Sequence, residues 1–142
     1  MSALRILLVE DNPDDVDVTK VALEQNSVDT ELGVADDGVI AIEILRKEGE
    51  HTSEETPDLI LLDLNLPRKT GFEVLEELKS DPDLKSIPVV VLTTSDDVRD
   101  VTVAYQLHAN SYVVKPVDLM EFIGAVKGII EYWDTVVQLP PN

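Results

Sequence analysis

Four places in the sequence carry side chains suited to chemistry, and each directly follows a run of apolar residues. They are Glu10 with Asp11, Asp63, Thr93, and Lys115. An ionised aspartate is rarely buried without a partner, so the position of Asp63 after the run Leu59–Leu62 is poorly suited to packing. It is well suited to chemistry, because open α/β sheets bind ligands at the carboxyl ends of their strands. Asp63 is therefore the centre of the predicted site.

Three carboxylates beside a hydroxyl and an ammonium favour a site for a metal ion and an oxyanion. Clustered carboxylates repel one another unless a cation joins them. An all-oxygen site that keeps water ligands suits Mg²⁺ better than Ca²⁺ or zinc. The hydroxyl and the lysine indicate that the visiting group is an oxyanion such as a phosphoryl group. Asp63 is then a candidate nucleophile, because aspartate carboxylates form acyl phosphates, and Mg²⁺ with Lys115 would neutralise the transferred charge.

Each residue also has a simpler interpretation. Asp11 can cap a helix, Thr93 can end a strand, and Lys115 can be a solvated side chain. Since the carboxyl ends of parallel strands lie at one edge of a sheet, the joint placement of these residues favours a functional site over coincidence.

The elements that must position these residues alternate between strand and helix. Apolar runs predict strands at 5–9, 30–35, 57–63, 89–92 and 111–114. Capping residues and helical spacing predict helices from 13, from 38 to 48, from 70 to 80, from 96 to 107 and from 118. Such alternation implies a parallel sheet with helices on both faces. We predict an α/β fold of the flavodoxin-like (βα)5 type, a three-layer sandwich with strand order 2-1-3-4-5 and an extended C-terminal helix.

Length and composition limit the possible functions. The 142 residues predict a single domain over 1–142, with a core at about 4–128 and a helix extension and tail at 129–142. The absence of cysteine excludes disulfides and thiolate chemistry. A net charge of −18 argues against binding to nucleic acid or to an anionic membrane surface. We expect a soluble, cytoplasmic protein, because neither a signal peptide nor an apolar membrane span is visible.

The last predicted helix continues an apolar stripe beyond the length that the fold requires. The stripe includes Ile129, Trp133, Val136 and Val137. One interpretation is that this tail folds back over its own domain. The preferred interpretation is a homodimer, because partners tend to bury exposed apolar stripes that contain a tryptophan.

Taken together, these residues resemble the receiver domain of two-component response regulators over essentially the whole chain. The matching segments are Val9–Asp11, Asp63–Pro67 with Gly71, Pro88–Ser95, and Tyr112–Pro116. The sequence D-L-N-L-P-R-K, the strand V-V-V-L-T-T-S and the tail from Tyr132 to Pro141 are similar to those of phytochrome-associated single-domain regulators.

The resemblance implies that Asp63 accepts a phosphoryl group from a histidine kinase, with a phytochrome-like kinase as one candidate, or from a phosphotransfer protein. It also implies that Asp11, Asp63 and the backbone carbonyl of Asn65 ligate Mg²⁺, with Glu10 acting through water. Thr93 and Lys115 would hold the phosphoryl oxygens.

The same resemblance makes Tyr112 a rotamer switch coupled to Thr93, and makes the peptide bond before Pro116 cis. Asn65, Thr94 and Ser95 would modulate the rates of phosphorylation and hydrolysis. Thr94 departs from the alanine or glycine common in the family, and its bulk is expected to narrow access to the phosphoryl acceptor.

The sequence therefore predicts a phosphorylation switch that acts by partner choice and is not an enzyme. No output domain is visible after the receiver. A Mg²⁺-dependent phosphohydrolase is one rival, although Asn65 stands where its second aspartate would be expected. A scaffold that works without phosphorylation is another. Turnover of phosphate esters would favour the first rival, and failure to label with acetyl phosphate would favour the second.

Overall fold

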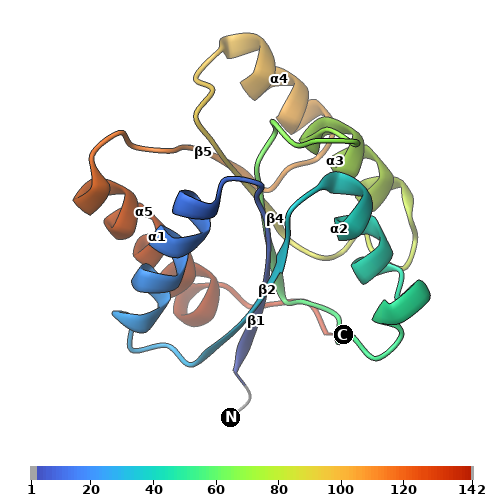
Figure 1. Ribbon diagram of the computed structural model, residues 1–142, viewed down its shortest axis with the longest axis horizontal. Coiled ribbons are helices and arrows are strands. Elements are labelled where there is room, and N and C mark those ends of the chain that lie inside the picture. Colours follow the sequence, from blue (N-terminus) through green and yellow to red (C-terminus); the bar gives the residue numbers. More distant parts are fainter. Residues whose placement is uncertain (1–2, 142) are drawn as a thin grey trace.

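The computed structural model describes residues 3–141, which form a central parallel sheet covered by helices on both faces (Figure 1). The strands are β1 (Leu4–Val9), β2 (Thr30–Ala35), β3 (Leu59–Leu62), β4 (Val89–Thr93) and β5 (Ser111–Val114). The sheet order is β2-β1-β3-β4-β5. The predicted flavodoxin-like fold and strand order are confirmed, and β2 and β5 have the predicted bounds.

Five α-helices follow the five strands in turn. They are α1 (Pro13–Glu24), α2 (Gly38–Leu45), α3 (Gly71–Ser80), α4 (Val98–Gln106) and α5 (Leu119–Glu131). Each begins after a residue whose side chain accepts a backbone N–H of the first turn, and for α3 Thr70 and Glu73 form a reciprocal capping box. A short 3-10 turn, Gly49–His51, lies between α2 and β3.

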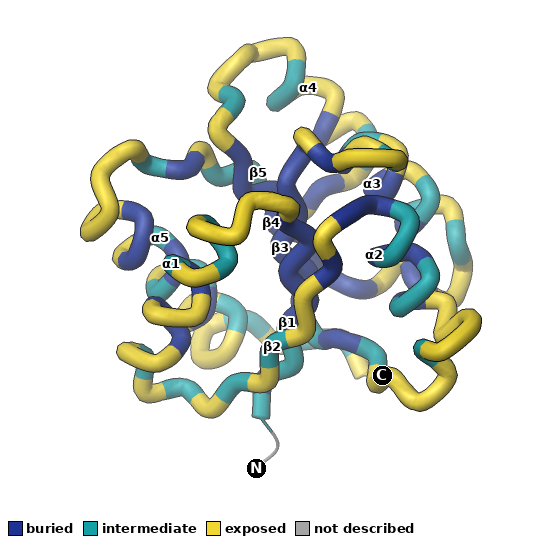
Figure 2. Tube along the Cα trace, in the orientation of Figure 1, coloured by how far each residue is buried: buried dark blue, intermediate teal, exposed yellow. Residues whose placement is uncertain are grey.

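The core has two halves, one on each face of the sheet. Helices α1 and α5 cover one face, and α2, α3 and α4 cover the other (Figure 1). The central strands are buried on both faces, as Figure 2 shows, and every residue of β3 is fully buried. This explains why the sequence of β3 is uniformly apolar rather than alternating. No helix among residues 3–141 is long and apolar enough to cross a bilayer.

The last helix continues beyond α5 as a π-helical turn, Tyr132–Val136, and the chain becomes extended at Val137. Ile129 and Trp133 pack against the domain's own core, and Leu139 packs there as well. The expectation that Trp133 is an exposed anchor is therefore wrong, because its side chain covers apolar surface of its own domain. Val136 is exposed, and Val137 is half-buried. The tail thus shields part of the core, as the first of the two interpretations expected.

Candidate functional site

The carboxyl ends of the strands bring the predicted residues together. Asp63 follows β3, and its N–H donates to the carbonyl of Val9 at 3.0 Å, which fixes it beside the end of β1. Glu10 follows β1, with its N–H bonded to the carbonyl of Ala35. Lys115 follows β5, and its N–H donates to the carbonyl of Thr93 at 2.7 Å. The sheet ladder therefore sets the positions of these side chains.

Lys115 lies at the centre of the site. Its Nζ donates to Glu10 Oε2 at 2.5 Å, to Asp15 Oδ2 at 2.8 Å and to Asp63 Oδ2 at 2.9 Å. The other oxygen of Asp63 accepts the hydroxyl of Thr93 at 2.9 Å and the N–H of Asn65 at 3.3 Å. Both oxygens of Asp63 are thus held by groups that can also bind a negatively charged ligand.

The pKa values of these buried groups shift in different directions, because hydrogen bonds and neighbouring charges act together with burial. Desolvation, together with the charge of Asp63, raises the pKa of Glu10 to about 7 against the opposing effect of Lys115. Desolvation alone would raise the pKa of Asp63, but hydrogen bonds from Lys115 and Thr93 outweigh it and lower that pKa. Desolvation opposes the charge on Lys115 as well, yet its three carboxylate partners raise its pKa. Asp63 is therefore the carboxylate that stays ionised.

Glu10, Asp11 and Asp63 fit a hard divalent cation. Each can offer a carboxylate oxygen, and these oxygens lie within 4.8 Å of one another. Glu10 and Asp63 are buried, whereas Asp11 is exposed and open to solvent. Burial, together with the charge of Asp63, raises the pKa of Glu10 despite Lys115, so a further cation would stabilise its ionised form. The three carboxylates carry more negative charge than Lys115 neutralises, and Asp11 is open to water. A ligand set of this kind, made of oxygen atoms only, matches the preferences of Mg²⁺.

The loop after β3 is packed too closely for a side chain at Gly71. The N–H of Gly71 donates to the carbonyl of Leu64 at 2.9 Å. A Cβ at this position would lie 2.3 Å from the carbonyl oxygen of Asp63, which is a severe clash. Glycine is therefore required here because α3 begins directly against the backbone of the central aspartate.

The neighbouring loop between β2 and α2 also contains a glycine that packs closely against the backbone of another loop. A Cβ at Gly38 would lie 2.1 Å from the carbonyl oxygen of Lys69. Asp37 caps α2 through Ile40 N–H and accepts Arg68 Nε at 2.7 Å. These contacts tie the β2–α2 loop to the β3–α3 loop that carries the site.

Tyr112 is joined to the loop that follows Thr93. Its hydroxyl donates to the carbonyl of Ser95 at 2.8 Å, and its ring is half-buried against the core. Ser95 Oγ donates to Asp100 Oδ2 at 2.6 Å, in the first turn of α4. The N–H of Tyr112 donates in turn to the hydroxyl of Tyr105, near the end of α4, at 3.2 Å. Tyr112 therefore connects both ends of α4 with β5.

The remaining predicted residues have mixed outcomes. Thr94 is exposed beside the buried Thr93. A metal-ligating role for the Asn65 carbonyl stays a prediction. The expected cis bond before Pro116 is wrong, because no peptide bond among residues 3–141 is cis. The trans form is the intrinsically favoured one even before proline, and in it Lys115 already reaches its three carboxylates.

Sequence reasoning missed two residues of this network, Asp15 and Tyr105. An acid in the first turn of a predicted helix is expected without any role at the site, although the place of Asp15 four residues after Asp11 puts it at the same sheet edge. Nothing in the local sequence marks Tyr105, whose contact depends on how α4 packs against β5.

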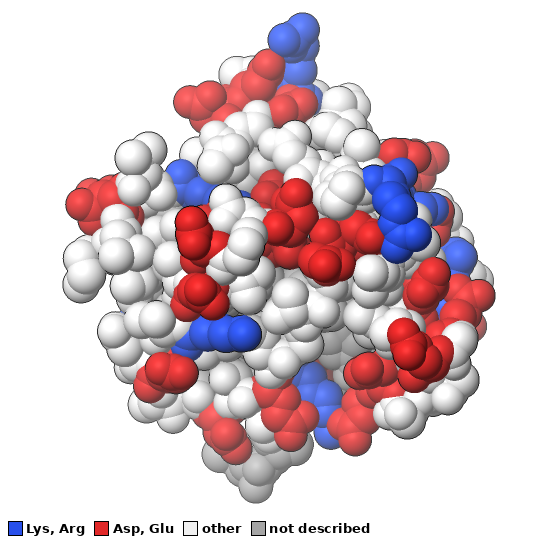
Figure 3. Space-filling model, in the orientation of Figure 1, with Lys and Arg blue, Asp and Glu red and all other residues white. Residues whose placement is uncertain are grey.

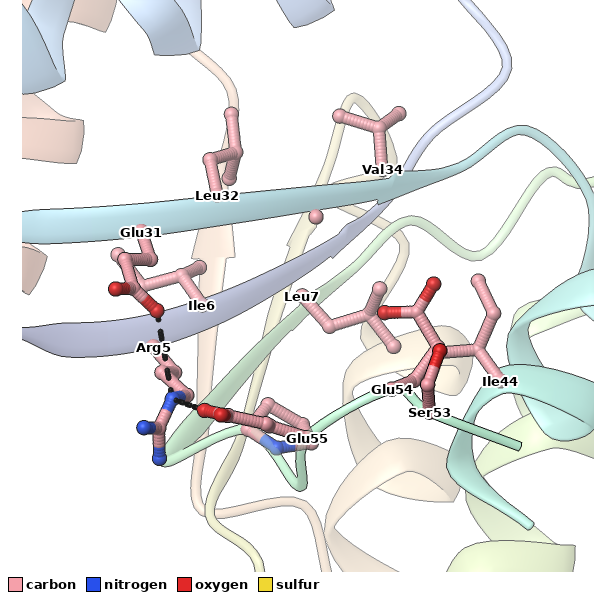
Figure 4. Close-up of a pocket in the computed structure, with 12 residues that line it drawn as sticks. Arg5, Ile6, Leu7, Glu31, Leu32, Val34, Ile44, Ser53, Glu54 and Glu55 are labelled. Atoms are coloured by element: carbon pink, nitrogen blue, oxygen red, sulfur yellow. Dashed lines mark ion pairs between the residues drawn. The ribbon is translucent and has the colours of Figure 1, made fainter. Parts of the chain in front are cut away.

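A second charged cluster lies at the opposite, amino-terminal edge of the sheet (Figure 4). Arg5 of β1 forms ion pairs with Glu31 of β2, at 3.4 Å, and with Glu55 in the loop before β3. These residues border a hollow of about 310 Å³ whose apolar wall includes Leu7 and Ile44. The hollow contains none of the predicted site residues.

Comparisons with known proteins agree with this fold. The family model of the response regulator receiver domain matches residues 6–127. The chain belongs to the response regulator receiver domain family.

Within that family the chain is similar to the response regulator Rcp1 of Synechocystis sp., with 47% identity over 135 residues, covering 95% of this chain and 92% of Rcp1. It is also similar to the crystal structure of the phosphorylated cyanobacterial phytochrome response regulator RcpA. That match has 47% identity and a TM-score of 0.96, and it covers 99% of this chain and 100% of the other. The Mn²⁺-bound form of Rcp1 matches with a TM-score of 0.92 and 46% identity, covering 96% and 99% of the two chains.

Proposed function

We propose that this protein is a phosphorylation switch in which Asp63 accepts a phosphoryl group in the presence of Mg²⁺. One observation carries the proposal: the ionised carboxylate of Asp63 is held by Thr93 and Lys115 beside two further carboxylates. A relative of 47% identity has been crystallised in a phosphorylated form, and another structure of 46% identity contains Mn²⁺.

The residues of this site suit an in-line transfer to a carboxylate. A carboxylate oxygen of Asp63 attacks phosphorus, and the bond from phosphorus to the donor's histidine nitrogen breaks as the acyl phosphate forms. Thr93 and Lys115, which contact Asp63 directly, are placed to donate hydrogen bonds to phosphoryl oxygens. Mg²⁺, held by Asp11, Asp63 and the Asn65 carbonyl with Glu10 acting through water, would supply the remaining positive charge.

Partner binding, rather than turnover, is the proposed output. The phosphoryl group adds charge and acceptor oxygens, which shift an existing equilibrium between two surface conformations. Tyr112 links the loop after Thr93 to α4, so this helix is the surface that would report the state of Asp63. The proposed donor is a cytoplasmic histidine kinase of the phytochrome kind, because RcpA is a phytochrome response regulator.

Labelling with acetyl phosphate and Mg²⁺ tests the proposal. Wild type should gain one phosphoryl group by mass spectrometry, and Asp63→Asn should gain none while keeping its fold by circular dichroism. Asp36→Asn is the matched control, since Asp36 is an exposed aspartate after β2 at the same sheet edge. Label on the Asp63→Asn protein would refute the assignment, and continuous release of phosphate from esters would favour the phosphohydrolase.

We also propose a homodimer, through a surface that shares only Val136 with the expected stripe. A ridge of exposed residues, spaced four apart, runs along α5 and its extension. It consists of Met120, Gly124, Gly128, Tyr132 and Val136. Apart from the helix's own backbone nearby, no atom lies within 4 Å of a Cβ added at either glycine, so a second helix can approach closely there. None of the five is charged, whereas the chain carries a net charge of −18 and acidic side chains are spread over the face in Figure 3. A second copy would therefore meet no charged side chain among the five residues of this ridge.

Sedimentation tests the dimer. Wild type should sediment as a dimer at micromolar concentration after phosphorylation, and Met120→Glu should shift it toward monomer. Val98→Glu is the control, because Val98 is exposed to a similar extent, 76% against 70%, but lies at the start of α4. Monomeric wild type with and without phosphorylation would remove the dimer from the proposal.

A further inference from the structure

The ammonium of Lys115 is shared with a carboxylate that lies outside the predicted metal cluster. Its three acceptors are Glu10 at 2.5 Å, Asp63 at 2.9 Å and Asp15 at 2.8 Å. An ammonium has three protons, so these bonds use all of its donors. Glu10 and Asp63 belong to the group of acids that could hold a metal ion, and Asp15 does not.

Asp15 comes from α1 rather than from a strand end. Its backbone carbonyl accepts the hydroxyl of Thr19 at 2.9 Å, and Thr19 is buried under the first turns of the helix. The side chain of Asp15 is 21% exposed, against 3% for both Lys115 and Glu10. Asp15 is therefore a partly hydrated anchor at the rim of the site.

We propose that Asp15 is a positioning residue that holds Lys115 and thereby sets the affinity of the site for Mg²⁺. The inference rests on the proposed function. Lys115 and the cation compete for the oxygens of Glu10 and Asp63, because both are drawn to the same carboxylates. A buried ammonium does not give up a partner without cost unless another acceptor remains. Asp15 is that acceptor, so it lowers the cost of releasing Glu10 and Asp63 to the metal.

The affinity for Mg²⁺ of charge-neutral variants tests this role. In calorimetric titrations with MgCl₂, Asp15→Asn should raise the dissociation constant about tenfold, the size typical of residues that orient metal ligands. Asp14→Asn and Asp17→Asn remove the same charge from exposed positions of the same helix, and should each change it by no more than about twofold.

A double-mutant cycle separates a positioning role from a general electrostatic one. In a Lys115→Met background, Asp15→Asn should have no larger effect than Asp14→Asn, because the residue through which Asp15 acts is gone. Equal effects of Asp15→Asn and Asp14→Asn in the wild-type background would overturn the inference. A tenfold effect that persists without Lys115 would overturn it as well.

The outcomes of these experiments distinguish a failure of the proposed function from a failure of this inference. If wild type binds no Mg²⁺, both are overturned. If wild type binds Mg²⁺ and is phosphorylated on Asp63, but Asp15→Asn behaves like its controls, only the role of Asp15 is lost. Should Lys115→Met fail to fold, the comparison of Asp15→Asn with Asp14→Asn decides alone.

Discussion

Two clusters in this protein each place one basic side chain among carboxylates, at opposite edges of the same sheet. At the carboxyl edge Lys115 meets Glu10, Asp15 and Asp63, and at the amino edge Arg5 meets Glu31 and Glu55 (Figure 4). The Lys115 side chain is 3% exposed and the Arg5 side chain 34%. The partners of Arg5, Glu31 and Glu55, are more than half exposed.

The difference in burial decides what each cluster can do. Water screens the Arg5 ion pairs, so they contribute little to stability and other side-chain arrangements could take their place. Beside Lys115, Glu10 and Asp63 are desolvated, and their pKa values move apart, with that of Glu10 raised and that of Asp63 lowered. Similar residue types thus form surface ion pairs at one edge of the sheet and a site that favours cation binding at the other. Burial, and not composition, separates the two.

Removing the basic residue from each cluster should give the largest contrast. Lys115→Met leaves Glu10 and Asp63 buried without their cation, and should lower the free energy of unfolding by about 3–5 kcal/mol in metal-free buffer. Arg5→Met should cost less than about 1 kcal/mol. Urea unfolding of both variants beside wild type measures the two values. Similar costs for the two substitutions would contradict the comparison.

The pH dependence of stability should come from the buried cluster. The folded-state pKa of Glu10, about 7, lies above its ordinary value of 4.5. Its contribution to stability is therefore complete below that ordinary value and is lost as the pH rises through about 7. Metal-free wild type should lose roughly 2–3 kcal/mol between about pH 5 and pH 8 relative to Glu10→Gln. Urea titrations across this range test the difference, and parallel profiles for the two proteins would argue against it.

Salt should have the smallest effect, and only at the exposed cluster. At about 1 M NaCl the screening length falls to roughly 3 Å, so the small cost of Arg5→Met should fall to within error. The cost of Lys115→Met should remain, because buried charges are screened far less. Repeating the urea experiments in high salt checks both statements. A Lys115→Met cost that disappears with salt would show that this cluster is open to ions.

Much of the fold could be predicted from the sequence because its local signals agree with one another. The uniformly apolar segment Leu59–Leu62 predicts a strand buried on both faces. The N-caps of the five helices are residues typical of that position, namely Asn12, Asp37, Thr70, Asp97 and Asp118. Parallel order then places Glu10, Asp63, Thr93 and Lys115 at one edge without further information. This part of the site follows from topology alone.

The unpredicted contacts depend on how elements pack. Acids in a first helical turn are common, so only the crossing of α1 over the sheet shows that Asp15 reaches Lys115. The helical spacing of the tail is the same whether Trp133 faces outward or inward, and its packing on the domain's own core required the three-dimensional structure. The trans bond before Pro116 likewise departs from the resemblance, since the free-energy difference between the two isomers is small.

The hydroxyl of Tyr105 affects how copies of this protein can assemble. β5 is an outer strand of the sheet, and an outer strand with free N–H groups can recruit a strand from another chain. Tyr105 already accepts the N–H of Tyr112, so an incoming strand would have to displace a phenol before it could pair at this position. Tyr105 therefore disfavours backbone pairing between copies at this position. The tyrosine that connects α4 to β5 thus also occupies a backbone donor of the outer strand that another chain could otherwise pair with.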